Sequence, residues 1–209
     1  MTDWRDGKSK DWAAYYALLK DRPPRTTTVF ARRRFREPGF AVDLGCGGGR
    51  DCLPLLEAGW RVLGIDREPA ALAALTEAAP AEWRDRLETR LGSFVEVDWP
   101  EADLIVAAFS LQFTPKPAFP ALWRRIRERL APGGRFAGHL IGARDSWARD
   151  GAPDGAVAFT RAECLALLQG LEIELFEEEE HDGQTPRGTA KHWHIFHIVA
   201  RKPQAAIAP

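Results

Sequence analysis

The sequence has little cysteine, no excess of charge of either sign and no long apolar run. Its three cysteines, Cys46, Cys52 and Cys164, form no Cys-x-x-Cys pair, and such a set is typical of reduced thiols. The 29 Lys and Arg residues are balanced by 30 Asp and Glu residues, which argues against a dedicated nucleic-acid-binding protein. No segment approaches the roughly 20 apolar residues of a membrane-spanning helix, and the polar N-terminal segment lacks the apolar core of a secretory signal. We therefore expect a cytoplasmic protein whose partner is neither nucleic acid nor a membrane.

What remains is the pattern of one globular α/β domain. Of the 209 residues, 45% are hydrophobic and 28% charged, which excludes a disordered chain, a collagen-like repeat and a coiled coil. Apolar runs predict strands over 39–44, 61–65, 87–94, 104–109, 135–141, 171–175 and 192–200. Helical patterns predict helices over 51–58, 69–79, 119–130 and 161–170.

Strands that alternate with helices predict a doubly wound, mostly parallel sheet of seven strands. The last two strands are joined by a polar turn over 181–190, too short for a helical crossover, so they should form a C-terminal antiparallel hairpin. Residues 1–38 precede the first strand, and we expect a helical segment there, a candidate lid across the carboxyl edge of the sheet. The catalytic or binding domain then spans 39–202, and 203–209 form a tail.

The clearest motif is the segment VDLGCGGGR, where a strand passes into a helix. In an open α/β sheet this is the place where ligands bind. A dinucleotide loop, Gly-x-Gly-x-x-Gly, fits Gly45 and Gly47 but has Arg50 at its third position, and a phosphate-binding loop would need a Gly-Lys-Ser/Thr ending. The S-adenosylmethionine form, acidic-x-Gly-x-Gly-x-Gly, fits Asp43, Gly45, Gly47 and Gly49 in full. A glycine-rich turn without any ligand is the remaining alternative.

A second acidic residue favours a nucleoside ligand. Asp66 ends the second strand, about 20 residues after Gly45, where a carboxylate accepts hydrogen bonds from both ribose hydroxyls. Gly45, Gly47 and Asp66 alone would also suit NAD. Asp43 before the loop and Arg50 at its end favour S-adenosylmethionine.

These segments resemble class I S-adenosylmethionine-dependent methyltransferases over roughly residues 39–202. VDLGCGGGRD is similar to the first motif of that family, GWRVLGIDREP to its second, and LAPGGRF to the stretch before its fifth strand. Within the family, GCGGGRDCLPLLEAGWRVLGID is similar to tellurite-resistance-type methyltransferases, while HWHIFHIVARK and RDSWARDG resemble bacterial methyltransferases with no settled substrate. The resemblance implies an enzyme that takes S-adenosylmethionine as cofactor and methylates an acceptor by in-line displacement.

The resemblance also implies which residues hold the cofactor. They are Arg25, Asp43, Gly45, Cys46, Gly47, Asp66, Arg67, Ser93, Phe94 and Phe109. Asp66 matches the ribose-binding acid, Arg67 could flank the adenine, and Arg25 is a candidate partner for the carboxylate of the cofactor. Ser93 stands where the family commonly has an aspartate that contacts the adenine amine. Cys46 lies inside the loop without the surroundings of a reactive thiol.

The sequence gives fewer indications of the residues that bind the methyl acceptor. Candidate residues for the acceptor pocket are Tyr16, Ser110 and Trp147. His139, near the end of the fifth strand, is a candidate general base, although a hydrogen-bonded structural histidine fits the same position. No catalytic dyad is evident, and methyl transfer needs a base only where the acceptor carries a proton.

The histidines near the C-terminus and the missing DNA-methyltransferase motifs bear on metal binding and on the acceptor. His192, His194 and His197 do not converge on one face, so we expect sheet packing and no metal. The Asn-Pro-Pro-Tyr and Pro-Cys motifs of DNA methyltransferases are absent, which favours a small-molecule acceptor. The alternatives left open are an NAD-dependent oxidoreductase and a non-catalytic regulatory module that binds S-adenosylmethionine.

Overall fold

In the computed structural model of the chain, the described residues are 15, 18, 19, 22–149 and 156–204. The strands are β1 Phe40–Leu44, β2 Arg61–Asp66, β3 Leu87–Leu91, β4 Ala102–Ala107, β5 Leu130–Gly142, β6 Ala158–Phe159, β7 Glu172–Gln184 and β8 Ala190–Arg201. The α-helices are α2 Thr26–Arg32, α3 Cys52–Glu57, α4 Pro69–Ala78, α5 Phe119–Arg129, α6 Ser146–Arg149 and α7 Arg161–Leu167. Short 3-10 helices are η1 Ala81–Arg86, η2 Leu111–Phe113 and η3 Lys116–Ala118.

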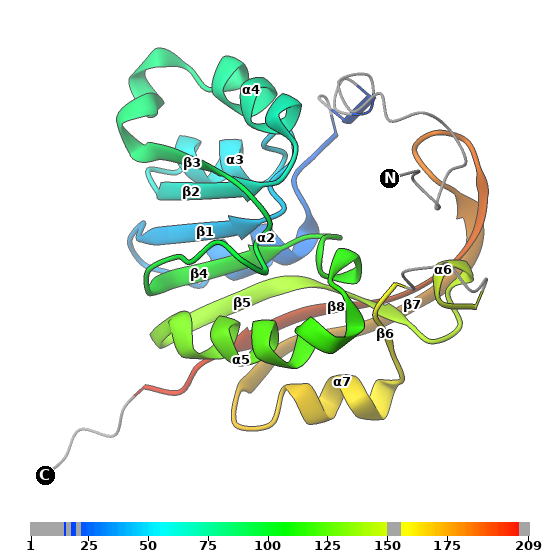
Figure 1. Cartoon of the computed structure of the whole chain (residues 1–209). Helices are drawn as coiled ribbons and strands as arrows, with labels where there is room; N and C mark the ends of the chain where they lie inside the picture. The colour runs from blue at the N-terminus through cyan, green and yellow to red at the C-terminus, as the bar shows by residue number, and fades with distance from the viewer. Residues whose placement is uncertain (1–14, 16–17, 20–21, 150–155, 205–209) are drawn as a thin grey trace, which may run out of the picture.

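The strands form one sheet in the order β3-β2-β1-β4-β5-β8-β7, with β6 paired to the end of β5 (Figure 1). Strands β1 to β5 run parallel, whereas β8 is antiparallel to both β5 and β7. The predicted doubly wound α/β fold with a C-terminal antiparallel hairpin is therefore confirmed. The strand order reverses between β1 and β4, so a crevice opens at the carboxyl ends of these two strands.

Helices cover both faces of the sheet because each central strand is apolar on both sides. One face buries Ala41, Val62 and Val106 beneath α2, α3 and α4. The other buries Val42 and Ile105 beneath α5 and α7. Amphipathic spacing drives the contact of α5, whose buried residues are Phe119, Leu122, Trp123 and Ile126.

The predicted capping box at the start of α7 is present. The Thr160 hydroxyl accepts from the backbone N–H of Glu163 at 3.3 Å, and the Glu163 carboxylate accepts from the backbone N–H of Thr160 at 2.7 Å. These two bonds satisfy backbone donors that a helix start leaves without partners.

The C-terminal hairpin differs from the expectation in two ways. The predicted polar turn over 181–190 is wrong, because β7 continues to Gln184 and the turn is confined to 185–189. Cross-strand pairing of acidic and histidine side chains supports strand geometry in this polar stretch. The sheet also holds an eighth strand, β6, whose two residues carry too short a pattern to be found in the sequence. The hairpin extends past the sheet, and its tip curves upward (Figure 1).

The N-terminal segment is helical in part. Helix α2 packs on the face formed by β4, β5 and β8 and does not lie across the carboxyl edge of the sheet. Tyr15, Leu19, Arg22 and Arg25, which precede it, do reach the crevice at that edge. Tyr16 lies outside the described residues. Within the described part of the chain, no helix has the length and apolar character needed to cross a membrane.

Candidate active site

The glycine loop after β1 is a tight turn bonded to β2. Gly45, Gly47 and Gly49 all have positive φ, at 80°, 53° and 91°. The backbone N–H groups of Gly45 and Cys46 both donate to the Ile65 carbonyl, at 2.8 and 3.1 Å. A Cβ on Gly45 would lie 2.5 Å from the Cβ of Ser110. Glycine is therefore required at this position both by its backbone conformation and by the close approach of Ser110, in the segment after β4.

Asp66 connects the end of β2 to this loop. Its Oδ2 accepts from the backbone N–H of Gly47 at 2.9 Å, and its Oδ1 accepts from that of Glu68 at 3.0 Å. Each oxygen keeps a further lone pair for a ligand hydroxyl. Burial raises the pKa of Asp66 above its ordinary value, against the opposing effect of these two backbone donors.

Two more carboxylates lie beneath the loop. Asp43 is buried, and its Oδ2 accepts from the thiol of Cys52 at 3.2 Å. Asp51 is also buried and accepts from the backbone N–H of Arg25 at 2.9 Å, which ties the start of α2 to the loop. Burial first, and then the charge of Asp51, raises the pKa of Asp43 well above its ordinary value.

Phe109, directly after β4, has a φ of 55°, which a bulky residue rarely adopts. Its ring stacks on His139 with the ring centres 4.2 Å apart, and the Arg25 guanidinium lies 4.2 Å from the same ring centre. Burial, followed by the charge of Arg50, lowers the pKa of Arg25 to about 10. The strained backbone thus presents an aromatic ring, flanked by a cation, to the crevice.

These elements surround a cavity of about 930 Å³ at the carboxyl edge of the sheet. The sequence-predicted residues that line it are Arg25, Asp43, Gly45, Cys46, Gly47, Asp66, Arg67, Ser93, Phe94, Phe109 and Trp147. Ser110 is instead buried under the loop against Gly45, and His139 is buried at 1% exposure with no lining position. The Nδ1 of His139 has no hydrogen-bond partner among the described residues, unlike the bonded structural histidine that the sequence suggests.

Sequence reasoning missed the wall that the hairpin supplies. Residues of β7, the turn and β8 line the cavity: Glu179, His181, Gln184, Thr185, Pro186, Arg187, Trp193, Ile195 and His197. The alternation in HWHIFH marks two faces of a strand, but only the curved hairpin brings one face to the crevice. The Arg187 guanidinium lies 5.3 Å from the ring centre of Tyr15, so the turn meets the N-terminal segment across the cavity.

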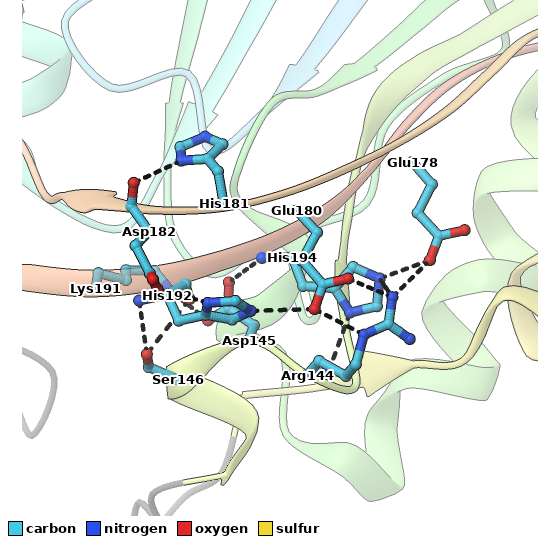
Figure 2. Close-up of polar contacts among 10 residues, drawn as sticks. All are labelled: Arg144, Asp145, Ser146, Glu178, Glu180, His181, Asp182, Lys191, His192 and His194. Atoms are coloured by element: carbon cyan, nitrogen blue, oxygen red, sulfur yellow. Dashed lines mark hydrogen bonds and ion pairs between the residues drawn. The ribbon is translucent and has the colours of Figure 1, made fainter.

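The opposite face of the hairpin carries a network of charges (Figure 2). Arg144 binds Glu180 at 2.6 Å and Glu178 at 3.1 Å, and the His194 ring meets Glu178 at 2.9 Å. His192 lies 2.7 Å from Asp182. Glu178 and Glu180 are thus both paired with side chains of β8 and of the loop after β5. No group of three or more His, Cys, Asp or Glu residues in the described ranges is arranged to hold a metal ion.

The residues present fit a nucleoside cofactor that ends in an amino acid. The left-handed glycines Gly45 and Gly47 line the cavity with bare backbone, and Asp66 offers a buried carboxylate beside them. Phe94 supplies an apolar wall, and Ser93 a hydroxyl that accepts from the backbone N–H of Val95 at 3.2 Å. The cavity volume is near the upper end of the range for small-molecule sites, about 300–1,000 Å³, which suits two ligands.

Comparison with known proteins points to methyltransferases. Residues 42–136 match the methyltransferase domain family. Trans-aconitate 2-methyltransferase of Acidovorax ebreus is 32% identical over 145 residues, 66% of this chain and 49% of that protein. Carboxy-S-adenosyl-L-methionine synthase of Chromohalobacter salexigens is 32% identical over 111 residues, 51% of this chain and 41% of that protein. The chain thus spans about half the length of the curated relatives it matches, or less.

Solved structures show the same fold. TehB from Haemophilus influenzae superposes with a TM-score of 0.72 and 19% identity, over 91% of this chain and 67% of that one. The 1,6-didemethyltoxoflavin-N1-methyltransferase of Burkholderia thailandensis, solved with its acceptor and S-adenosylhomocysteine, gives a TM-score of 0.65 at 22% identity, over 95% and 93% of the two chains.

The fold and the loop define a nucleoside-binding, doubly wound α/β protein. Residues 42–136 carry the match to the methyltransferase domain family, and the fold is the one shared by TehB and the 1,6-didemethyltoxoflavin-N1-methyltransferase.

Proposed function

We propose that the protein transfers the methyl group of S-adenosylmethionine to a small-molecule acceptor bound in the same cavity. The observation that carries this proposal is the hydrogen bond between Asp66 and the backbone N–H of Gly47, which places a buried carboxylate beside the glycine loop in a cavity of about 930 Å³. When bound, the cofactor supplies a methyl group on a positively charged sulfur, so the protein mainly has to position the acceptor and exclude water.

The cofactor residues are proposed from their positions along the cavity wall. Asp66 binds the ribose hydroxyls, Phe94 packs on the adenine, and the loop with Asp43 holds the amino-acid end. Arg25 binds the carboxylate of the cofactor. The guanidinium of Arg25 has no hydrogen-bond partner among the described residues, and burial already disfavours its charge, so an anion would stabilise it.

The acceptor is proposed to lie between Phe109 and the hairpin wall. Trp193 meets the ring of Phe109 with the ring centres 6.3 Å apart, and Trp147 meets Trp193 at 5.7 Å. Such an aromatic wall suits a small organic molecule. The curated relatives named above act in the same chemical class, as their names state, which supports a small molecule over nucleic acid.

The described residues that precede α2 are proposed to belong to a lid, since Tyr15, Leu19 and Arg22 line the cavity. A cytoplasmic location is proposed as well, because the three cysteines are free thiols, which a reducing compartment preserves.

Calorimetric titration with S-adenosylmethionine, S-adenosylhomocysteine and NAD tests the cofactor. We expect binding of the first two and none of NAD. Binding of NAD alone would indicate an NAD-dependent oxidoreductase instead. Binding without transfer to any of a broad set of acceptors, followed by mass spectrometry, would favour the regulatory module.

A further inference from the structure

The cavity wall contains a carboxylate that bridges two histidines. Glu179, His181 and His197 lie on the face of the β7–β8 hairpin that lines the cavity. Glu179 meets the Nε2 of His197 with its Oε2 and the Nε2 of His181 with its Oε1, both at 2.6 Å. Figure 2 shows that His181 points away from the Arg144 side of the strand. This triad is separate from the charge network on the outer face.

The two histidines differ in the proton that each can take. The Nδ1 of His181 lies 3.1 Å from the carbonyl oxygen of Asp182, so both of its ring nitrogens face acceptors. Those acceptors raise the pKa of His181, the carbonyl first and Glu179 second. Protonated His181 therefore donates from both ring nitrogens, to Glu179 and to the Asp182 carbonyl, whereas its neutral ring would turn one lone pair toward an acceptor.

His197 has the opposite arrangement. Glu179 accepts from its Nε2–H, which fixes the neutral ring as the tautomer with a lone pair on Nδ1. The described residues offer that Nδ1 no hydrogen-bond partner. A carboxylate that holds one imidazole nitrogen while the other keeps its lone pair is the arrangement of a positioned base.

The triad lies close to the place where the methyl group would be presented. His197 meets the ring of His139 with the ring centres 4.9 Å apart, and His139 stacks on Phe109 at the end of β4. His139 itself lies behind this wall, and burial lowers its pKa well below its ordinary value, with a smaller effect from the charge of His197. His197, which lines the cavity, is thus better placed than His139 to meet an acceptor.

We propose that His197 is the general base that deprotonates the acceptor, with Glu179 as its positioning residue, and that the acceptor atom carries a proton, as in a hydroxyl or thiol group. The inference rests on the proposed function. A carboxylate acceptor is already ionised at neutral pH and needs no base.

In the proposed step, the Nδ1 of His197 takes the proton of the acceptor X–H while X forms its bond to the methyl carbon and the carbon–sulfur bond breaks. The bonding electrons go to sulfur, which loses its positive charge. The proton then leaves to water, and Glu179 stabilises the imidazolium in the meantime.

The charged groups that surround His197 come from the strands on either side of β8. They are Glu177, Glu179 and His181 on β7 and His139 on β5, while Arg25 and Arg50 at the loop side of the cavity act on His139. Because Glu179 is the direct contact, its removal should have the largest effect on the tautomer of His197.

Nitrogen-15 NMR of histidine-labelled protein saturated with S-adenosylhomocysteine tests the tautomer. We expect the neutral His197 to carry its proton on Nε2 and to lose this tautomer preference in Glu179→Ala. A proton on Nδ1 of the neutral ring, or a tautomer that Glu179→Ala leaves unchanged, would overturn the proposal.

Methyl transfer to three probes, phenol, dithiothreitol and trans-aconitate, gives the second arm. For a protic probe, His197→Gln should lower kcat by about 10²–10⁴-fold. His192→Gln, on the outer face, is the matched control and should keep the wild-type rate. A transfer rate that His197→Gln leaves unchanged, or transfer to trans-aconitate alone, would contradict the role of His197 as general base. The proposed function would still stand in that case if calorimetry shows that S-adenosylmethionine binds. If the wild type fails to bind S-adenosylmethionine, the proposed function fails instead.

Discussion

Lys191 and Asp145 form an ion pair that is buried on both sides, with side chains 1% and 0% exposed. The Lys191 ammonium also lies 4.1 Å from the ring centre of Trp147 and 4.3 Å from that of Trp193. The backbone N–H groups of Trp147 and His194 both donate to the Asp145 carboxylate. This pair therefore fixes the loop after β5 against β8 and positions both tryptophans of the cavity wall.

Breaking this pair should destabilise the protein strongly. Lys191→Met leaves a buried carboxylate without its cation, which costs about 3–5 kcal/mol in other proteins. Urea unfolding followed by tryptophan fluorescence would measure the loss. Lys202→Met is the matched control, because among the residues that the structure describes that lysine binds backbone carbonyls alone, including Leu130 at 2.6 Å. A loss in Lys191→Met no larger than in the control would contradict the assignment.

Asp66 should control affinity for S-adenosylmethionine. Asp66→Ala removes an acceptor for the ribose hydroxyls, and loss of hydrogen bonds to a charged group corresponds to about 10- to 100-fold weaker binding. Calorimetry measures it, with Asp85→Ala as control, since Asp85 is 79% exposed on η1. Equal affinity of wild type and Asp66→Ala, with the fold intact by circular dichroism, would contradict the placement of the cofactor.

Cofactor binding should also depend on Asp66 through pH. Burial raises its pKa, so the carboxylate takes up its proton at a higher pH than an exposed aspartate does. Affinity should fall as the pH is lowered through that raised pKa, because the neutral acid is a weaker acceptor. Asp66→Asn should flatten this part of the calorimetric pH profile. If the pH profile of cofactor affinity is the same in Asp66→Asn as in the wild type, the pH dependence would be assigned to Asp43 instead.

The glycine loop should tolerate no side chain at its first glycine. Gly45→Ala combines a positive φ with a Cβ 2.5 Å from that of Ser110, whereas Gly188→Ala has a similar φ of 82° with nothing within 4 Å. Gly188→Ala should therefore lose only about 1 kcal/mol from its backbone conformation. Gly45→Ala should lose clearly more in urea unfolding and should weaken cofactor binding. Equal losses in the two variants would show that β4 does not constrain the loop.

Buried His139 should make stability depend on pH in a defined direction. Its pKa is lowered in the folded protein, so the unfolded chain binds more protons below the ordinary histidine pKa. The free energy of unfolding should therefore fall as the pH drops from about 7 to about 5, by up to roughly 1.4 kcal/mol per pH unit for this one group. His139→Phe should reduce that slope in urea titrations.

His181 provides a control of opposite sign. Its pKa is raised in the folded protein, so it contributes stability at low pH that is lost as the pH rises. His181→Gln should therefore steepen the loss of stability on acidification. If both variants shift the slope in the same direction, the assignment of charge states to these two histidines is wrong.

Much of the fold could be predicted because it rests on local patterns. The run GFAVDL, the glycines after it and Asp66 after the second run specify β1, the loop and β2 in order. Helix α7 begins at its predicted capping box. The boundaries that failed lie where the pattern is ambiguous: the Glu177–Glu180 run has no apolar alternation, so only cross-strand pairing shows that β7 continues through it.

The sequence by itself determined the fold class, the glycine loop and the acid that faces it, because these depend on residues close together in the chain and on backbone conformations that few residues adopt. Only the tertiary structure decided the hairpin wall of the cavity. It brings Glu179, His181 and His197 to the crevice through the curvature of a long hairpin and places His139 behind Phe109. Such contacts join residues far apart in sequence, and their distances follow from the packing of the whole sheet, which no local pattern encodes.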